Sequence, residues 1–142
     1  MTARLPAPHR SLPIALLRAR EGVMAPIRDM LAETGITEQQ WRVLRVLSED
    51  GVMDTKTLAN RACLLFPSLT RIASTLRDKG LVTQTRDTRD RRRQFIEITP
   101  EGQAFIDANA ARAARIIDGY KATLGAEAYE RLLDLLAELD PH

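Results

Sequence analysis

The stretch that decides the fold is residues 81–98, which read LVTQTRDTRDRRRQFIEI. Its two ends, 81–85 and 94–98, carry the β-branched and aromatic residues that suit paired strands. Between them, residues 86–93 hold five arginines and two aspartates. The pattern predicts a β-hairpin with a strongly charged tip.

A helix is expected directly before this hairpin, over residues 67–79, with Gly80 as its stop signal. Its apolar positions recur at the spacing of one helix face and are Leu69, Ile72, Ala73 and Leu76. The other faces carry hydroxyls and arginines that suit base edges and phosphates. The residues of this helix predicted to contact DNA are Pro67, Ser68, Thr70, Arg71, Ser74, Thr75 and Arg77. A helix followed by a basic hairpin is the layout of a winged helix-turn-helix.

The charge distribution supports a polyanionic partner for the middle of the chain. Residues 54–99 hold 10 Lys and Arg against 5 Asp and Glu, a net charge of +5. Residues 1–53 hold 7 against 6, and residues 100–142 hold 4 against 8, giving +1 and −4. The whole-chain value of +2 therefore conceals a basic segment of the kind that faces a phosphate backbone.

Several other classes of protein fit the composition poorly. Cys63 is the single cysteine, and His9 and His142 lie in the tails, so no metal-binding spacing or Ser-His-Asp arrangement is present. No apolar run approaches the roughly 20 residues that span a bilayer, and residues 1–10 lack the apolar stretch of a signal peptide. The sequence predicts a cytoplasmic protein that is not an enzyme and needs no metal or cofactor.

The rest of the chain reads as further helices. Thr37 with Gln40 forms a capping box, Asp54 and Thr99 are N-caps, and Pro26 predicts a kink in the first helix. Helices are predicted at 11–33, 37–50, 55–62, 100–124 and 126–139, with a short strand at 52–53. The expected fold is mainly α with a small β-hairpin wing.

The last helix predicts self-association. It carries an apolar surface made of Leu132, Leu133, Leu135, Leu136 and Leu139. Residues 1–10 are expected to be a flexible arm and 11–142 a single domain. Within that domain, 11–36 and 100–142 are assigned to a helical dimerisation region, and 37–99 to the winged helix-turn-helix DNA-binding lobe. A homodimer suits a pseudo-palindromic operator on double-stranded DNA.

This order of elements resembles the MarR family of winged helix-turn-helix regulators. Residues 87–92, DTRDRR, and 96–102, IEITPEG, look like that family's wing signature running into its next helix. The similarity is closer still to the regulators of homoprotocatechuate degradation operons. It runs through 11–12, 14–17, 19–21, 37–42, 61–63 and 67–70.

The resemblance implies roles for the wing residues and a regulatory function. Asp90 would orient Arg92, and Arg92 would enter a narrow minor groove. Phosphate or solvent contacts are expected for Arg86, Arg89, Arg91 and Arg93. The protein would be a homodimeric repressor that leaves its operator when an aromatic acid of the hydroxyphenylacetate type binds.

An aromatic carboxylate needs a cation in a partly apolar cleft. Arg20 lies four residues from both Leu16 and Met24, beside the apolar face of the first helix, so it is the candidate for the carboxylate. The residues proposed to line the ring are Ser11, Trp41, Arg45 and Cys63. Each can equally be explained by ordinary packing, and Arg20 by a salt bridge within the dimer.

Three alternatives stay open. Cys63 could make the protein a thiol-based redox sensor, although its neighbours Ala62 and Leu64 favour burial of the thiol. A dimeric interaction module with incidental basic residues and a small-molecule enzyme are the others. Steep salt dependence of duplex affinity would separate a DNA-binding protein from both.

Overall fold

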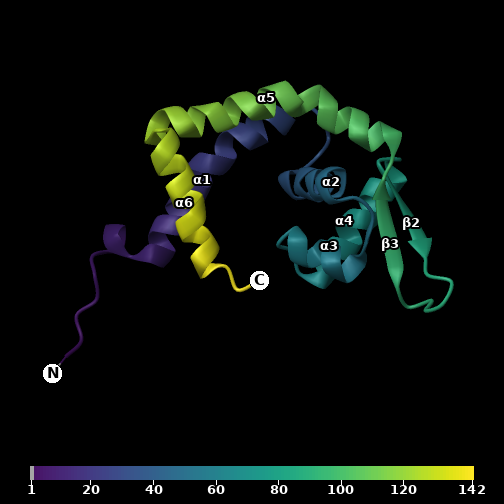
Figure 1. Cartoon of the computed structure of the whole chain (residues 1–142), viewed down its shortest axis with the longest axis horizontal. Helices are drawn as coiled ribbons and strands as arrows, with labels where there is room; N and C mark the ends of the chain where they lie inside the picture. Colours follow the sequence, from purple (N-terminus) through teal and green to yellow (C-terminus); the bar gives the residue numbers. More distant parts are fainter. Residues whose placement is uncertain (1) are drawn as a thin grey trace.

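A computed structural model of the chain describes residues 2–142, so Met1 of the predicted arm lies outside the described residues. Figure 1 shows a helical protein with one small sheet. The elements are η1 (Pro8–Arg10), α1 (Leu12–Leu31), α2 (Glu38–Asp50), β1 (Met53–Asp54), α3 (Thr55–Arg61), α4 (Phe66–Asp78), β2 (Val82–Arg86), β3 (Gln94–Ile98), α5 (Pro100–Leu124) and α6 (Ala126–Leu139). The predicted fold class and order of elements are confirmed.

The sheet is antiparallel, with strand order β1-β3-β2. The predicted hairpin pairs Val82 with Ile98 and Arg86 with Gln94. The predicted short strand lies one residue later than expected and joins β3, with Asp54 opposite Phe95. This third strand joins the start of α3 to the base of the wing.

The core lies where α2, α3 and α4 meet the sheet. Leu44, Leu58, Leu69 and Ile96 are fully buried there. The predicted apolar face of α4 is confirmed, because all four of its apolar residues are buried. Trp41 packs edge-on against Phe105 of α5, with ring centroids 6.0 Å apart, so α5 closes one side of this core.

The predicted caps form as hydrogen bonds. In the capping box, the Gln40 amide donates to Thr37 Oγ1 and the Thr37 amide donates to Gln40 Oε1, both at 3.1 Å. Asp54 Oδ1 accepts from the Thr57 amide at 2.7 Å, and Thr99 Oγ1 accepts from the Gly102 amide at 3.0 Å. These bonds satisfy amides at the starts of α2, α3 and α5 that have no partner within the helix.

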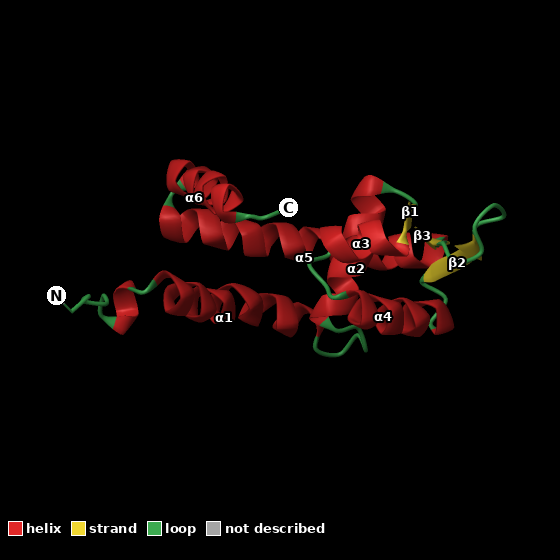
Figure 2. Cartoon of the chain, turned by 90° about the horizontal axis from the view of Figure 1, so that it is seen from below, coloured by secondary structure: helices red, strands yellow, loops and turns green. Residues whose placement is uncertain are grey.

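The long helices α1 and α5 each contribute one end to this core, through Met30, Leu31 and Ile106, and extend away from it. α1 and α5 run side by side (Figure 2), and the Tyr120 hydroxyl donates to the Val23 carbonyl oxygen between them. α1 is one continuous helix that includes Pro26. α6 has no buried residue, and its five leucines are exposed, as the sequence predicted. None of the helices among residues 2–142 is long and apolar enough to cross a membrane.

Candidate nucleic-acid interface and ligand cavity

The recognition helix α4 presents hydroxyls whose protons are already engaged. Thr70 Oγ1 donates to the Phe66 carbonyl oxygen at 3.0 Å, and Thr75 Oγ1 donates to the Arg71 carbonyl oxygen at 3.1 Å. Their lone pairs remain available, so these hydroxyls can accept a hydrogen bond from a donor outside the helix, such as the amino group of a base. Arg71 is exposed and has no side-chain partner among residues 2–142, which leaves its guanidinium free to reach a guanine or a phosphate.

The far end of α4 is tied to the wing. Arg77 donates to Gln84 Oε1 of β2 at 3.0 Å and to Ser74 Oγ at 3.3 Å. It also bonds the neighbouring Asp78. The sequence did not predict this contact between α4 and β2, because it forms only when β2 folds back beside α4. Direct DNA contacts from Arg77 and Ser74 stay a prediction.

The wing tip has the arrangement that the resemblance implied. Asp90 Oδ1 accepts from the Arg92 amide at 3.1 Å and from Arg92 Nε at 3.2 Å. The Arg92 side chain is 92% exposed, so its guanidinium projects from the tip. Arg86 Nη1 donates to the Arg91 carbonyl oxygen at 3.2 Å, and Asp87 Oδ1 accepts from the Arg89 amide at 2.9 Å. The carboxylates shape the loop, and the arginine charges of Arg89, Arg91 and Arg92 face outward.

Arg93 is half exposed, as a residue that touches phosphate or solvent would be, and it also makes an ion pair that the sequence did not predict. Its Nη2 and Nε donate to Asp54 Oδ2 at 2.7 and 3.2 Å, and its guanidinium lies 5.1 Å from the Phe95 ring centroid. The Thr57 amide and Arg93 together lower the pKa of Asp54 from 3.8 to about 2, and Asp54 in turn raises the pKa of Arg93. The cause is the β1–β3 pairing, which brings Asp54 beside a residue 39 positions later.

A cavity of about 260 Å³ lies between α1 and α2. It is lined by Met24, Ile27, Glu38, Trp41, Arg42 and Arg45. The predicted pair Trp41 and Arg45 meets here, whereas Glu38 and Arg42 were missed. Their i, i+4 spacing on one face of α2 was the available signal.

Charges surround this cavity. Arg42 Nε lies 3.3 Å from Glu38 Oε1, and this buried nitrogen makes no hydrogen bond. Arg45 Nη1 lies 3.4 Å from Glu49 Oε1. Arg20 does not line the cavity and lies 4.0 Å from Glu38 Oε2 of the same chain, so its role as a carboxylate partner or in a salt bridge within the dimer stays a prediction. The remaining two candidates, Ser11 and Cys63, are not part of the lining.

The predicted burial of Cys63 is wrong. Cys63 is exposed, and its backbone is left-handed with φ of 55°. Ala62 takes the buried position, and the chain turns at Cys63 between α3 and α4. The left-handed turn directs the thiol outward.

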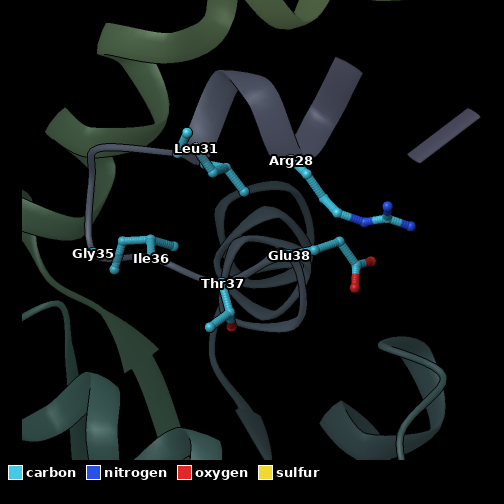
Figure 3. A pocket seen from close by; sticks show the side chains of 7 residues that line it. Arg28, Leu31, Gly35, Ile36, Thr37 and Glu38 are labelled. Carbon is cyan, nitrogen blue, oxygen red and sulfur yellow. The ribbon is translucent and has the colours of Figure 1, made fainter. Parts of the chain in front are cut away.

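A larger hollow of about 510 Å³ adjoins the first at the α1–α2 turn (Figure 3). Leu31 and Ile36 contribute apolar side chains to it, while Arg28 and Glu38 project together from its rim. Arg28 also bonds both carboxylate oxygens of Glu21, at 3.0 and 3.2 Å. Among residues 2–142, no group of three or more His, Cys, Asp or Glu could hold a metal ion.

Comparison with known proteins agrees with this geometry. The MarR family model matches residues 36–93, from the start of the lobe to the wing. The HTH-type transcriptional regulator FarR of Neisseria gonorrhoeae is 40% identical over 131 residues, covering 92% of this chain and 90% of FarR. The chain belongs to the MarR family. It is a DNA-binding transcriptional regulator and not an enzyme.

Two further relatives indicate which branch of the MarR family this chain resembles. The homoprotocatechuate degradative operon repressor of Escherichia coli is 40% identical over 130 residues, covering 92% of this chain and 88% of the repressor. The crystal structure of NadR in complex with 4-hydroxyphenylacetate superposes with a TM-score of 0.82 at 39% identity. That match covers 96% of this chain and 97% of NadR. The resemblance to the homoprotocatechuate branch is therefore confirmed.

Proposed function

We propose that this MarR family protein is a homodimeric repressor of an operon for aromatic-acid degradation, released from its operator by an aromatic monocarboxylate. The observation that best supports this proposal is the α1–α2 cavity, where the Trp41 indole and the guanidiniums of Arg42 and Arg45 line a space of about 260 Å³. Relatives that repress a homoprotocatechuate operon or bind 4-hydroxyphenylacetate support the class of ligand.

The cavity suits an aromatic acid for physical reasons. Trp41 offers a flat apolar surface to the ring, and Arg42 or Arg45 offers the cation for the carboxylate. Glu38 lies beside Arg20 and Arg42, and Glu49 lies beside Arg45, so the three arginines and two glutamates together leave one net positive charge near the ligand, and the Arg42 Nε is unbonded. The proposed carboxylate partner therefore moves from Arg20 to Arg42 and Arg45.

The operator is proposed to be bound by two copies of the lobe. Residues 37–99 form the DNA-binding lobe, and the exposed leucines of α6 with the apolar residues of α1 bury one another across the dimer. The two recognition helices would then enter successive major grooves about 34 Å apart. Contacts come from Pro67, Ser68, Thr70 and Arg71 of α4 and from the wing arginines around Arg92. A regulator of this kind acts in the cytoplasm, where the operator lies.

The test is retention of an operator duplex, followed by fluorescence anisotropy at fixed salt. The duplex is one enriched from a randomised pool by the full chain, and the panel contains phenylacetate, benzoate and cinnamate derivatives. Release by at least one acid supports the proposal. Absence of a response to all of them would remove the aromatic-acid ligand while leaving DNA binding in place.

Matched variants locate the site. Arg45→Gln and Arg42→Gln each remove one cation from the cavity and are expected to raise the acid concentration needed for release. Arg28→Gln removes a cation from the neighbouring hollow and serves as the control. Release that depends on Arg28 and not on Arg42 or Arg45 would assign the ligand to the larger hollow.

A thiol switch is the second candidate, because Cys63 is exposed in the turn before the recognition helix. Oxidation there would add bulk beside the DNA-facing end of α4. Peroxide should then release the operator from the wild type and not from Cys63→Ser. Equal behaviour of the two proteins would exclude this candidate.

A further inference from the structure

The start of the recognition helix carries two exposed apolar side chains that the proposed contacts leave unused. Leu65 is 78% exposed and Phe66 is 51% exposed. In the described lobe, residues 37–99, Val52 is the only other large apolar residue with comparable exposure. Covering these two neighbouring side chains with a partner would be favourable.

The start of α4 lacks the side-chain cap that stabilises the starts of α2, α3 and α5. α2, α3 and α5 each begin with a Thr or Asp whose side chain accepts a backbone hydrogen bond. At α4 the capping position is occupied by Leu65, and no side chain caps the helix. A Ser, Thr, Asp or Asn at that position would stabilise the helix. Leu65 therefore occupies a capping position at which Ser, Thr, Asp or Asn would make α4 more stable.

The surroundings of the pair identify the partner's chemistry. Phe66 lines a hollow of about 350 Å³ with Lys56 of α3 and with two ion pairs, Arg92 with Asp90 and Arg93 with Asp54, so its lining carries one net positive charge. An apolar partner protein would have to meet these cations, whereas DNA matches both features. Its phosphates neutralise the cations, and the thymine methyl group is the apolar feature of the major groove.

We infer that Leu65 and Phe66 recognise thymine methyl groups in the major groove and so contribute to the choice of operator. The N-terminal residues of a recognition helix are the ones that meet base edges, and Leu65 and Phe66 are the capping residue and first residue of α4. The pair supplies apolar contact, while Thr70 and Arg71 supply hydrogen bonds. The inference rests on the operator binding of the proposed function and is independent of the effector.

The test replaces thymines of the enriched duplex one at a time by deoxyuridine, which lacks only the methyl group. For the wild type, one thymine in each half-site is expected to lose about fourfold in affinity on replacement, the burial of about one methyl group. In Leu65→Ala/Phe66→Ala, affinity for the thymine duplex falls, and the difference between thymine and deoxyuridine disappears.

Two controls separate base recognition from loss of folding and from charge. Leu65→Ser supplies a helix cap, so it is expected to raise the midpoint of thermal unfolding while it weakens the thymine preference. Arg92→Ala is expected to lower the slope of log affinity against log salt concentration by about one and to keep the thymine preference.

Three outcomes would overturn the inference. In the first, wild-type binding is insensitive to deoxyuridine at every position. In the second, the preference survives in the double variant. In the third, Leu65→Ser or the double variant changes the oligomeric state, which would assign the apolar pair to a contact between copies of the chain. If the wild type binds no duplex at all, the proposed function fails together with the inference.

Discussion

The carboxylate of Asp54, whose charged form is stabilised by the Thr57 amide and by Arg93, makes the stability of the lobe depend on pH in the acid range. Asp54 Oδ1 caps α3 through the Thr57 amide, and Asp54 Oδ2 receives both bonds from Arg93. The Asp54 side chain is only 14% exposed. Asp54→Asn keeps a residue that caps helices well and removes the negative charge, so it isolates the ion pair from the cap.

The magnitude follows from the pKa. A pKa lowered from 3.8 to about 2 corresponds to about 2 kcal/mol in favour of the folded state, and screening at the solvent-facing Arg93 reduces this to about 1 kcal/mol. Because the folded pKa of Asp54 lies below the unfolded value, the contribution is complete above about pH 4. It is lost as the pH falls from there through about 2.

Urea unfolding of the wild type and Asp54→Asn, followed by circular dichroism, measures this difference. At pH 7 the variant should be less stable by about 1 kcal/mol, and the two proteins should converge as the pH approaches 2. Asp54→Ala, which also removes the cap, should lose about 1 kcal/mol more. The exposed carboxylate Asp78 gives the matched control, since Asp78→Asn should change stability little. A difference between wild type and Asp54→Asn that is constant from pH 7 to pH 2 would refute the reasoning.

Three further changes test the lobe, the wing and the dimer. Gly102→Ala places a Cβ against the Leu81 carbonyl oxygen and 2.7 Å from Ile98 Cγ1, so a loss of about 1–3 kcal/mol is expected in urea unfolding; unchanged stability would contradict the close approach. Arg92→Ala should weaken duplex binding and lower the salt slope by about one, and an unchanged slope would place Arg92 away from the duplex. Leu135→Glu puts a charge on the exposed face of α6 and should shift the mass in sedimentation toward the monomer, whereas a retained dimer would assign the interface to other residues.

The elements themselves could be predicted from local signals in the chain. Capping by Thr37, Asp54 and Thr99 and the apolar spacing in α4 are decided within a few residues. These short-range interactions are the ones that periodicity and capping rules describe. The Asp90–Arg92 bond is also local, since its partners are two positions apart, but it was implied by the resemblance to the MarR wing and not by a local rule.

The misjudged residues depend on contacts far along the chain or on one backbone angle. The ion pair of Arg93 with Asp54 was not predicted, because the two residues are 39 positions apart and only the β1–β3 pairing brings them together. Cys63 sits between apolar neighbours, and a single left-handed turn exposes it. The i, i+4 spacing of Glu38 and Arg42 places them on one face of α2, but only the tertiary packing of α1 against that face makes them line the cavity.

The position of the cavity limits how an effector can act. α2 borders the cavity and is also fastened to α5, where the Ser48 hydroxyl donates to Gln103 Oε1 at 2.9 Å. An effector between α1 and α2 would therefore act on the placement of the lobe relative to the long helices.

To weaken operator binding tenfold, an effector must favour the released conformation by about 1.4 kcal/mol. Linkage then requires the operator to weaken effector binding by the same factor. Calorimetric titration of the acid into the protein with and without saturating duplex measures this factor directly. Equal affinities in the two titrations would show that the cavity, even if occupied, does not control the operator.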